Sequence, residues 1–303
     1  MIQERLKELR AQMQERGIDI YIVPTADFHE SEYVGDHFKA RKFITGFTGS
    51  AGTAVITLDE AGLWTDGRYF VQAENQLKDS TVTLYRMGEE GVPTVDEFVK
   101  DRLKEGGCLG FDGRVVNGTW GGRLEKIAAE KNVSMHVTED LIDLIWEDRP
   151  ALSKQPLFIL EEKYSGKSTA DKIGDLRKAM KENGADVHIL TSLYDIAWLL
   201  NIRGNDIDYV PVVLSYLVLN ETECIWFLQE EVVDDKIRAY LEENHITTKP
   251  YDAIYDYVPE IPADAVVLMN RGTVNYRIVN SLDKAIKVVD KPNPTELMKA
   301  VKN

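Results

Sequence analysis

Two short stretches of the sequence gather side chains that could perform chemistry. Residues 27–33 (DFHESEY) place carboxylates, a histidine and a hydroxyl directly after an apolar, β-branched run. Loops that follow buried strands commonly carry the functional groups of α/β proteins. Residues 64–69 (WTDGRY) form the second stretch. Asp66 is predicted to cap the helix that follows it, and Arg68 would then project from the first turn of that helix.

The predicted position of Arg68 raises the question of its partner. Because a helix dipole favours anions near the N-terminus, an arginine in the first turn needs some other group to hold it. Two interpretations are open at this point. Arg68 either makes a structural ion pair at the surface or contacts a ligand.

The glycine-rich residues 46–53 (GFTGSAGT) resemble a phosphate loop only superficially. They lack the Gly-Lys-Ser/Thr ending, and they lead into a predicted strand, whereas a phosphate cradle uses the amides of a helix N-terminus. A nucleophile elbow needs a glycine two positions before the serine, and Thr48 stands there before Ser50. We therefore expect a tight turn that leads into a strand.

The remaining residue types give no catalytic pattern. The histidines are His29, His37, His136, His188 and His245. None belongs to a His-Glu-x-x-His motif, and His188 falls on a predicted core strand. Cys108 and Cys224 lie in different halves of the chain and are expected to be buried free thiols. Without a nucleophile and base, a metal-ligand cluster or a cofactor fingerprint, these residues predict non-catalytic domains without a cofactor of their own.

Hydrophobic periodicity supplies the elements around these stretches. Apolar residues at helical spacing predict a helix over residues 2–16, ended by Gly17, and a strand over residues 18–23. Strands and helices go on alternating as far as residue 111, and this order is typical of the α/β class.

The second half of the chain then repeats the first. With one constant offset, Leu9 and Met13 match Leu176 and Met180, and Gly17 matches Gly184. Both halves continue through a polar stretch to an apolar segment with a glycine, at residues 44–46 and 202–204, and then to paired strands. This shared order predicts an internal duplication of domain size.

Chain length and a proline-containing segment predict the domain boundaries. At roughly 150 residues per domain, 303 residues predict two domains. Two prolines among charged residues at 146–156 are typical of a linker. We therefore predict one domain over residues 1–150 and a second over residues 151–290. Residues 291–303 are predicted to be a further linker with the start of a helix.

The charge balance excludes several classes of partner. The net charge of −15 disfavours nucleic acid and anionic membranes. No apolar run reaches membrane-spanning length, and the N-terminus lacks the basic-then-apolar pattern of a signal peptide. We expect a cytoplasmic protein.

Taken together, these strings resemble the Xaa-Pro aminopeptidases (aminopeptidase P) of the creatinase and prolidase superfamily. The resemblance extends over nearly the whole chain. The matching strings are PTAD at 24–27, HESEY at 29–33, FTGSAGT at 47–53, LWTDGRYF at 63–70, IWEDRP at 145–150, DIAWL at 195–199, NIRG at 201–204, PV at 211–212 and KAVKN at 299–303.

The resemblance implies a three-domain enzyme. It would have two related N-terminal α/β domains of the creatinase type, each a mixed sheet flanked by helices with a ribonuclease H-like motif, and then a pita-bread catalytic domain. In that third domain carboxylates and a histidine hold two divalent ions, usually manganese, whose bridging hydroxide attacks the Xaa-Pro bond. The chain stops at Asn303, so the resemblance places none of these ligands here.

The resemblance also implies roles for individual residues. The arginine of the WTDGRY string is a peptide-substrate contact in the family, and it falls on Arg68. A planar guanidinium suits a carbonyl or carboxylate acceptor. Asp195, Trp198 and Arg203 are further candidates for the cleft wall, as is His29.

These inferences give one hypothesis and several alternatives. The chain is interpreted as the non-catalytic N-terminal portion of a metal-dependent Xaa-Pro aminopeptidase. It would be inactive alone, would shape substrate access and assembly in the whole enzyme, and would form part of a homo-oligomer, expected to be a dimer. Its partner would be a peptide with proline at the second position. The alternatives are a prolidase-type or creatinase fragment, a non-enzymatic protein-binding relative of the pita-bread family, and a free-standing α/β binding protein.

Overall fold

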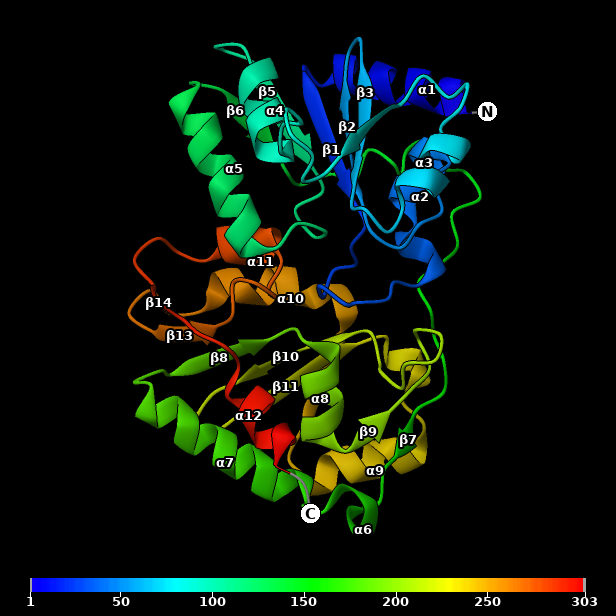
Figure 1. Ribbon diagram of the computed structural model, residues 1–303. Coiled ribbons are helices and arrows are strands. Elements are labelled where there is room, and N and C mark those ends of the chain that lie inside the picture. Colours follow the sequence, from blue (N-terminus) through cyan, green and yellow to red (C-terminus); the bar gives the residue numbers. More distant parts are fainter. Residues whose placement is uncertain (1, 302–303) are drawn as a thin grey trace. The chain divides into compact units, whose positions relative to one another are not determined.

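The computed structural model describes residues 2–301 and divides them into two compact units (Figure 1). Unit 1 comprises residues 2–28 and 36–151, and unit 2 comprises residues 29–35 and 152–301. The last two residues of the predicted linker 291–303 lie outside the described residues. No helix in the described part of the chain is long and apolar enough to cross a membrane.

Unit 1 is built on a six-stranded mixed sheet in the order β4-β3-β2-β1-β5-β6. Its elements in chain order are α1 (Ile2–Glu15), β1 (Ile20–Pro24), the 3-10 turn η1 (Asp36–Phe38), α2 (Ala40–Thr45), β2 (Thr53–Thr57), β3 (Ala61–Thr65), α3 (Phe70–Gln76), β4 (Thr83–Arg86), α4 (Val95–Arg102), β5 (Cys108–Phe111), α5 (Gly118–Glu130) and β6 (Ser134–His136).

Helices cover both faces of this sheet. Because side chains alternate along a strand, Tyr21 and Val23 of β1 join one face and pack with Leu9 of α1. Trp64 of β3 points to the other face, where its ring meets Phe98 of α4 at 4.8 Å between centroids. Every residue of β1 is buried, as expected for a strand covered on both sides.

Unit 2 repeats this plan with the strand order β12-β11-β10-β8-β13-β14, beside a short β7-β9 pair. Its elements are β7 (Phe158–Ile159), α6 (Glu162–Ser165), α7 (Thr169–Glu182), β8 (Val187–Leu190), α8 (Leu193–Leu200), β9 (Ile202–Arg203), β10 (Ser215–Leu219), β11 (Cys224–Leu228), η2 (Glu230–Val232), α9 (Asp235–Glu243), β12 (Thr247–Pro250), η3 (Tyr251–Ala253), α10 (Ile254–Tyr257), η4 (Val258–Glu260), β13 (Val266–Met269), α11 (Tyr276–Ser281), β14 (Lys287–Asp290) and α12 (Pro294–Ala300).

The two sheets have the same connectivity. In each, the first strand is antiparallel to the second strand and parallel to the fifth: β1 lies between β2 and β5, and β8 lies between β10 and β13. The α/β class, with two mixed sheets, is therefore confirmed.

The predicted duplication extends to individual contacts. Gly17 and Gly184 both adopt a left-handed conformation, with φ of 65° and 62°, just after the ends of α1 and α7. Asp19 Oδ2 accepts the backbone N–H of Cys108 at 2.8 Å. Asp186 Oδ2 accepts that of Val266 at the same distance. The matched residues thus make equivalent contacts in the two units.

One detail of the predicted repeat is wrong. The sequence comparison matched residues 44–46 with 202–204, but the left-handed residue that ends α2 is Gly46, whereas the one that ends α8 is Asn201. Gly204 follows strand β9 instead. A glycine and an asparagine serve the same position because both tolerate positive φ.

Candidate functional site

Arg68 lies in unit 1, in the connection from β3 to α3, and its side chain is 69% exposed. Asp66 holds it from one side: Oδ1 accepts a hydrogen bond from Nε and Oδ2 accepts one from Nη2, each at 2.8 Å. Oδ1 also accepts the backbone N–H of Arg68 at 3.1 Å. The hydrogen bonds from Arg68 lower the pKa of Asp66 to about 2.

The predicted helix cap at Asp66 is wrong. Helix α3 begins at Phe70 with Tyr69 in the N-cap position, and no side chain caps it. Residues 66–69 form a turn first, in which the N–H of Tyr69 donates to the carbonyl of Asp66 at 3.0 Å. This turn moves Asp66 away from the helix terminus and frees its carboxylate to hold Arg68.

The outer edge of the Arg68 guanidinium stays open. Among the described residues, nothing accepts a hydrogen bond from Nη1, while the guanidinium carbon lies 5.3 Å from the centre of the Tyr69 ring. The Tyr69 hydroxyl is hydrogen-bonded to Ser50 Oγ at 2.6 Å. Arg68 is therefore fixed on one edge and available on the other.

The glycine-rich loop beside this site is held by Arg41, which the sequence analysis did not single out. Arg41 is 3% exposed, and its guanidinium donates to Thr25 Oγ1 at 2.9 Å, to the carbonyl of Phe47 at 2.5 Å and to the carbonyl of Gly49. Burial lowers its pKa to about 10. The burial of Arg41 was hard to predict, because lysines and arginines are nearly always exposed. The sequence hinted at it only by placing Arg41 near the apolar residues of α2.

Close packing also fixes this loop. A side chain at Gly49 would bring its Cβ within 2.2 Å of the Phe47 ring. The loop runs from α2 into β2, as the sequence predicted.

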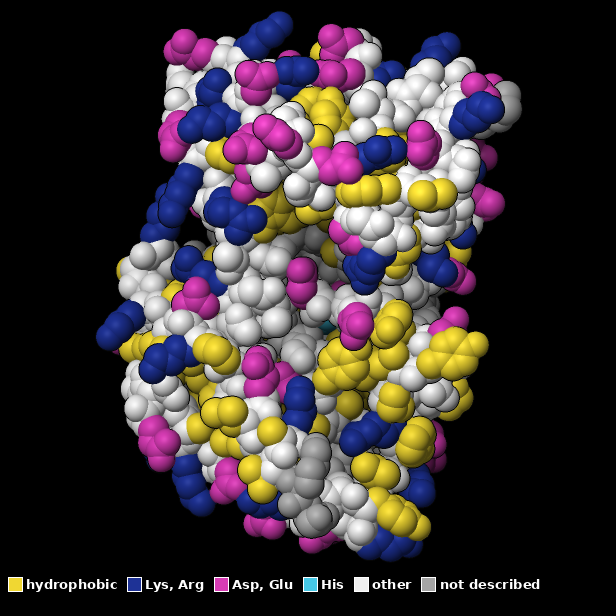
Figure 2. All heavy atoms as spheres, viewed as in Figure 1, with side chains coloured by type: hydrophobic (Ala, Val, Ile, Leu, Met, Phe, Trp, Pro, Cys, Tyr) yellow, Lys and Arg dark blue, Asp and Glu magenta, His cyan; other side chains and the backbone are white. Residues whose placement is uncertain are grey.

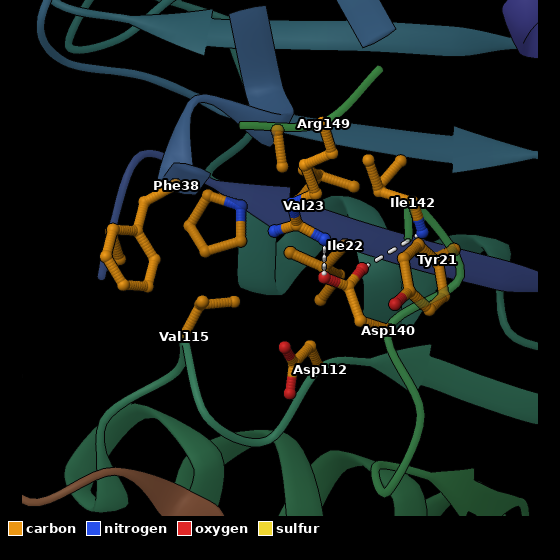
Figure 3. A pocket seen from close by; sticks show the side chains of 12 residues that line it. Tyr21, Ile22, Val23, Phe38, Asp112, Val115, Asp140, Ile142 and Arg149 are labelled. Carbon is orange, nitrogen blue, oxygen red and sulfur yellow. Dashed lines mark hydrogen bonds and ion pairs between the residues drawn. The ribbon is translucent and has the colours of Figure 1, made fainter. Parts of the chain in front are cut away.

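A second polar group in unit 1 lines a small cavity at the carboxyl ends of β1 and β5 (Figure 3). Asp140 is paired with Arg149 at 2.6 Å, and Asp112 accepts hydrogen bonds from Nε and Nη2 of Arg114, each at 3.0 Å. Burial raises the pKa of Asp112. The cavity has a volume of about 10 Å³, enough for roughly one water molecule and far too small for a peptide.

His29 lies in unit 2 and is 2% exposed. Its Nε2 is 2.6 Å from the Tyr251 hydroxyl and its Nδ1 is 3.1 Å from the Thr191 carbonyl oxygen. Nδ1 must donate to that carbonyl, because a carbonyl oxygen only accepts, and the Tyr251 hydroxyl is the hydrogen-bond partner of Nε2. The imidazole also packs against Tyr216, with 4.5 Å between ring centres. His29 is thus part of the unit 2 interior.

Asp195, in α8, is 1% exposed and fastens helix α12. Its Oδ1 accepts from Lys299 Nζ at 2.5 Å, and its Oδ2 accepts from Asn293 Nδ2 at 3.3 Å. Residues 293–299 of the predicted linker are therefore packed on unit 2.

Trp198 and Arg203 lie at the C-terminal end of α8, where cations meet the last carbonyls of the helix. Lys172 Nζ donates to the Trp198 carbonyl at 2.8 Å and lies 4.5 Å from the centre of its ring. Arg203 donates to the Ala197 carbonyl. Such contacts satisfy carbonyls left without helical partners and complement the negative end of the helix dipole. Burial lowers the pKa of Arg203.

The structure therefore brings Asp195, Trp198 and Arg203 together around α8 and places His29 elsewhere in unit 2. Arg68 belongs to unit 1. Residues 2–301 contain no group of three or more His, Cys, Asp or Glu side chains placed to hold a metal ion. On the face that Figure 2 shows, acidic and basic side chains are intermingled. Both cysteines are buried free thiols, as predicted.

Comparisons with known proteins cover both units. Two models described as the creatinase/prolidase N-terminal domain match the chain, one over residues 5–145 and the other over residues 148–303. The probable Xaa-Pro aminopeptidase P of Neurospora crassa is 39% identical over 290 residues, which cover 94% of this chain and 42% of that protein. That of Chaetomium globosum is 38% identical over 315 residues, covering 99% of this chain and 50% of that protein.

A solved structure agrees with these matches. The X-prolyl aminopeptidase from Caenorhabditis elegans, described as a cytosolic enzyme with a di-nuclear active site, superposes with a TM-score of 0.94 and 32% identity. The match covers 100% of this chain and 52% of that one. The chain thus spans about half the length of the relatives it matches. It belongs to the creatinase/prolidase family, as a homologue of Xaa-Pro aminopeptidase P with two creatinase/prolidase N-terminal domains.

Proposed function

We propose that this chain is the N-terminal, non-catalytic portion of a metal-dependent Xaa-Pro aminopeptidase, which removes the N-terminal residue that precedes a proline. One observation carries the proposal: the whole chain matches about half of an X-prolyl aminopeptidase that is described as having a di-nuclear active site. The two units shape substrate access and assembly, and the substrate is a peptide with proline at its second position.

The two divalent ions, expected to be manganese, are held outside residues 2–301 in this proposal. The described residues offer no fitting ligand group, so no step of the reaction is assigned to them. The negative net charge supports a peptide rather than a nucleic acid as partner. The C. elegans relative's description as cytosolic supports a cytoplasmic location. The homo-oligomer, expected to be a dimer, can be checked by the mass of the full protein in solution.

Within this portion we assign the contact with substrate to Arg68. Its exposed outer edge and its fixed inner edge support this role, because a preorganised donor loses little freedom when it binds. Asp195, Trp198, Arg203 and His29 stay second-rank candidates for the cleft, since each already has intramolecular partners.

The first experiment measures hydrolysis of an Xaa-Pro peptide by the 303-residue chain and by the full protein, with manganese present. We expect turnover by the full protein only, and no tight manganese binding by the 303-residue chain. Turnover by the shorter chain would refute the proposal.

The second experiment replaces Arg68 with alanine in the full protein. Loss of one charged hydrogen-bond donor should lower kcat/KM by about 10- to 100-fold. Arg123→Ala is the matched control, because Arg123 is also exposed and paired with an aspartate, Asp96, at 2.9 Å. An unchanged kcat/KM in the Arg68 variant would remove this residue from the site.

A further inference from the structure

We propose that Asp66 determines which acceptor Arg68 prefers, by making it a contact for an uncharged peptide carbonyl rather than for a free carboxylate. This inference rests on the proposed role of Arg68 as a substrate contact. Asp66 acts here as a positioning residue, because it touches the guanidinium and not the peptide.

The first argument is geometric. Asp66 occupies the side of the guanidinium formed by Nε and one hydrogen of Nη2. The outer edge, formed by Nη1 and the second hydrogen of Nη2, is the remaining place where two parallel N–H groups can meet an acceptor. Because the backbone N–H of Arg68 also binds Asp66, the direction of that edge is set by the turn at residues 66–69.

The second argument concerns charge. Arg68 and Asp66 together are neutral, and the pKa of Asp66, near 2, keeps its carboxylate ionised at any pH at which a peptidase is assayed. An incoming carboxylate meets the attraction of Arg68 and the repulsion of Asp66, whereas a carbonyl oxygen needs only the donors. The pair therefore removes most of the advantage that an unpaired arginine gives to a free carboxylate.

The third argument is the support behind the pair. Tyr69 lies against the guanidinium and is itself tied to Ser50 in the glycine-rich loop, which Arg41 holds from the interior. The position of the Arg68 guanidinium is thus supported by Tyr69 and, through Tyr69, by the glycine-rich loop of unit 1. A donor fixed in this way distinguishes acceptors by position and charge rather than by adapting to each.

The test uses the full protein and a ladder of peptides with proline at position two, from two to five residues long, each with a free or an amidated C-terminus. The measured quantity is the ratio of kcat/KM for the free form to that for the amidated form. At the length whose terminus reaches Arg68, Asp66→Asn should raise this ratio about fivefold, mainly through KM. Asp66→Ser, which keeps an acceptor for the Arg68 N–H, should give the same rise if the asparagine variant folds poorly.

The outcomes separate this inference from the proposed function. If Arg68→Ala has no effect, the assigned role of Arg68 fails. If Arg68→Ala lowers kcat/KM while Asp66→Asn and Asp66→Ser leave the ratio unchanged at every length, only the role of Asp66 is overturned. Equal losses for both peptide forms also overturn it, because a merely structural role lowers both alike. Asp96→Asn, which affects the Arg123 pair, is the control and should leave the ratio unchanged.

Discussion

In the described part of the chain, carbonyl oxygens rather than carboxylates hold three cations, of which Arg41 and Lys172 are buried and Arg203 is half-buried. Arg41 donates to loop carbonyls, while Lys172 and Arg203 donate to carbonyls at the end of α8. Lys172 is 1% exposed and also donates to Asn201 Oδ1 at 2.6 Å. Partial negative charge on carbonyl oxygens offsets only part of the cost of burying a full positive charge. Burial, with the nearby cations Arg203 and Lys167, accordingly lowers the pKa of Lys172 to about 8.

This shift predicts a pH-dependent stability. The unfolded chain keeps the pKa of Lys172 near 10.5, so below pH 8 the folded state bears the full cost of a buried ammonium. Between pH 8 and 10.5 the folded state loses this proton before the unfolded state does, and the free energy of unfolding should rise, by on the order of 3 kcal/mol. Denaturant titrations of the wild type and of Lys172→Met across this range isolate the effect as their difference. A pH-independent difference would contradict the prediction.

Some of the site residues were predictable and others were not. Arg68 stands out because the helix dipole disfavours an arginine in a first helical turn, which predicts that some other group holds it. In the structure Asp66 is such a partner. Little in the sequence indicated that Arg41 is buried. Its partners include the carbonyls of residues 47 and 49, and every residue type has a carbonyl. Burial of a charge on such acceptors depends on the loop's conformation, which no sequence pattern specifies.

At the scale of elements, helix α12 is attached to unit 2 through two helices and a side-chain ion pair. It packs against α7 and α8, and an ion pair joins Lys299 to the buried Asp195. Lys299 is 32% exposed, but its removal leaves the charge of Asp195 buried without this cation. Breaking a fully buried pair in this way costs about 3–5 kcal/mol, and this half-buried pair should cost less. The attachment of α12 should therefore depend strongly on this contact.

Lys299→Met tests this dependence. We expect amide exchange in residues 294–300 to become at least about tenfold faster, with little change in β8 or β10, because the helix can detach locally. Lys178→Met is the matched control, since Lys178 makes an exposed pair with Asp175 at 3.3 Å, worth at most about 1 kcal/mol. Unaltered exchange of residues 294–300 in the Lys299 variant would show that other contacts hold the helix.

Element types followed from periodicity where it was strong. The spacing of Ile173, Leu176 and Met180 predicted α7, and all three are buried. The start of α3 was misplaced because Asp66 suits both a helix cap and a turn, and the two differ only in which N–H the carboxylate accepts. The tertiary hydrogen bond between Tyr69 and Ser50 accompanies the turn.

At the scale of the whole molecule, each of the two duplicated units makes an equivalent contact between strands. Asp19 joins β1 to β5 in unit 1, and Asp186 joins β8 to β13 in unit 2, by the same carboxylate-to-amide hydrogen bond at the same position. Each carboxylate has its strand partner within its own unit.

Matched variants test this equivalence. Asp19→Ala should speed amide exchange in β1 and β5 only, and Asp186→Ala in β8 and β13 only. Loss of one charged hydrogen bond should cost about 1–2 kcal/mol in the unit concerned. Each variant is the control for the other. Faster exchange in both sheets with either substitution would contradict the expectation that the contacts act within one unit.

The order of helices and strands, the duplication and the family can all be obtained from the chain without coordinates. They rest on local properties: the spacing of apolar side chains, glycines that need positive φ, and short strings such as WTDGRY. The pairing of Asp66 with Arg68, the burial of Arg41, His29 and Lys172, and the attachment of α12 by Asp195 needed the tertiary structure. These contacts depend on where a loop or a helix end places a polar atom in three dimensions, and a difference of a few ångströms there decides between a surface charge and a buried one.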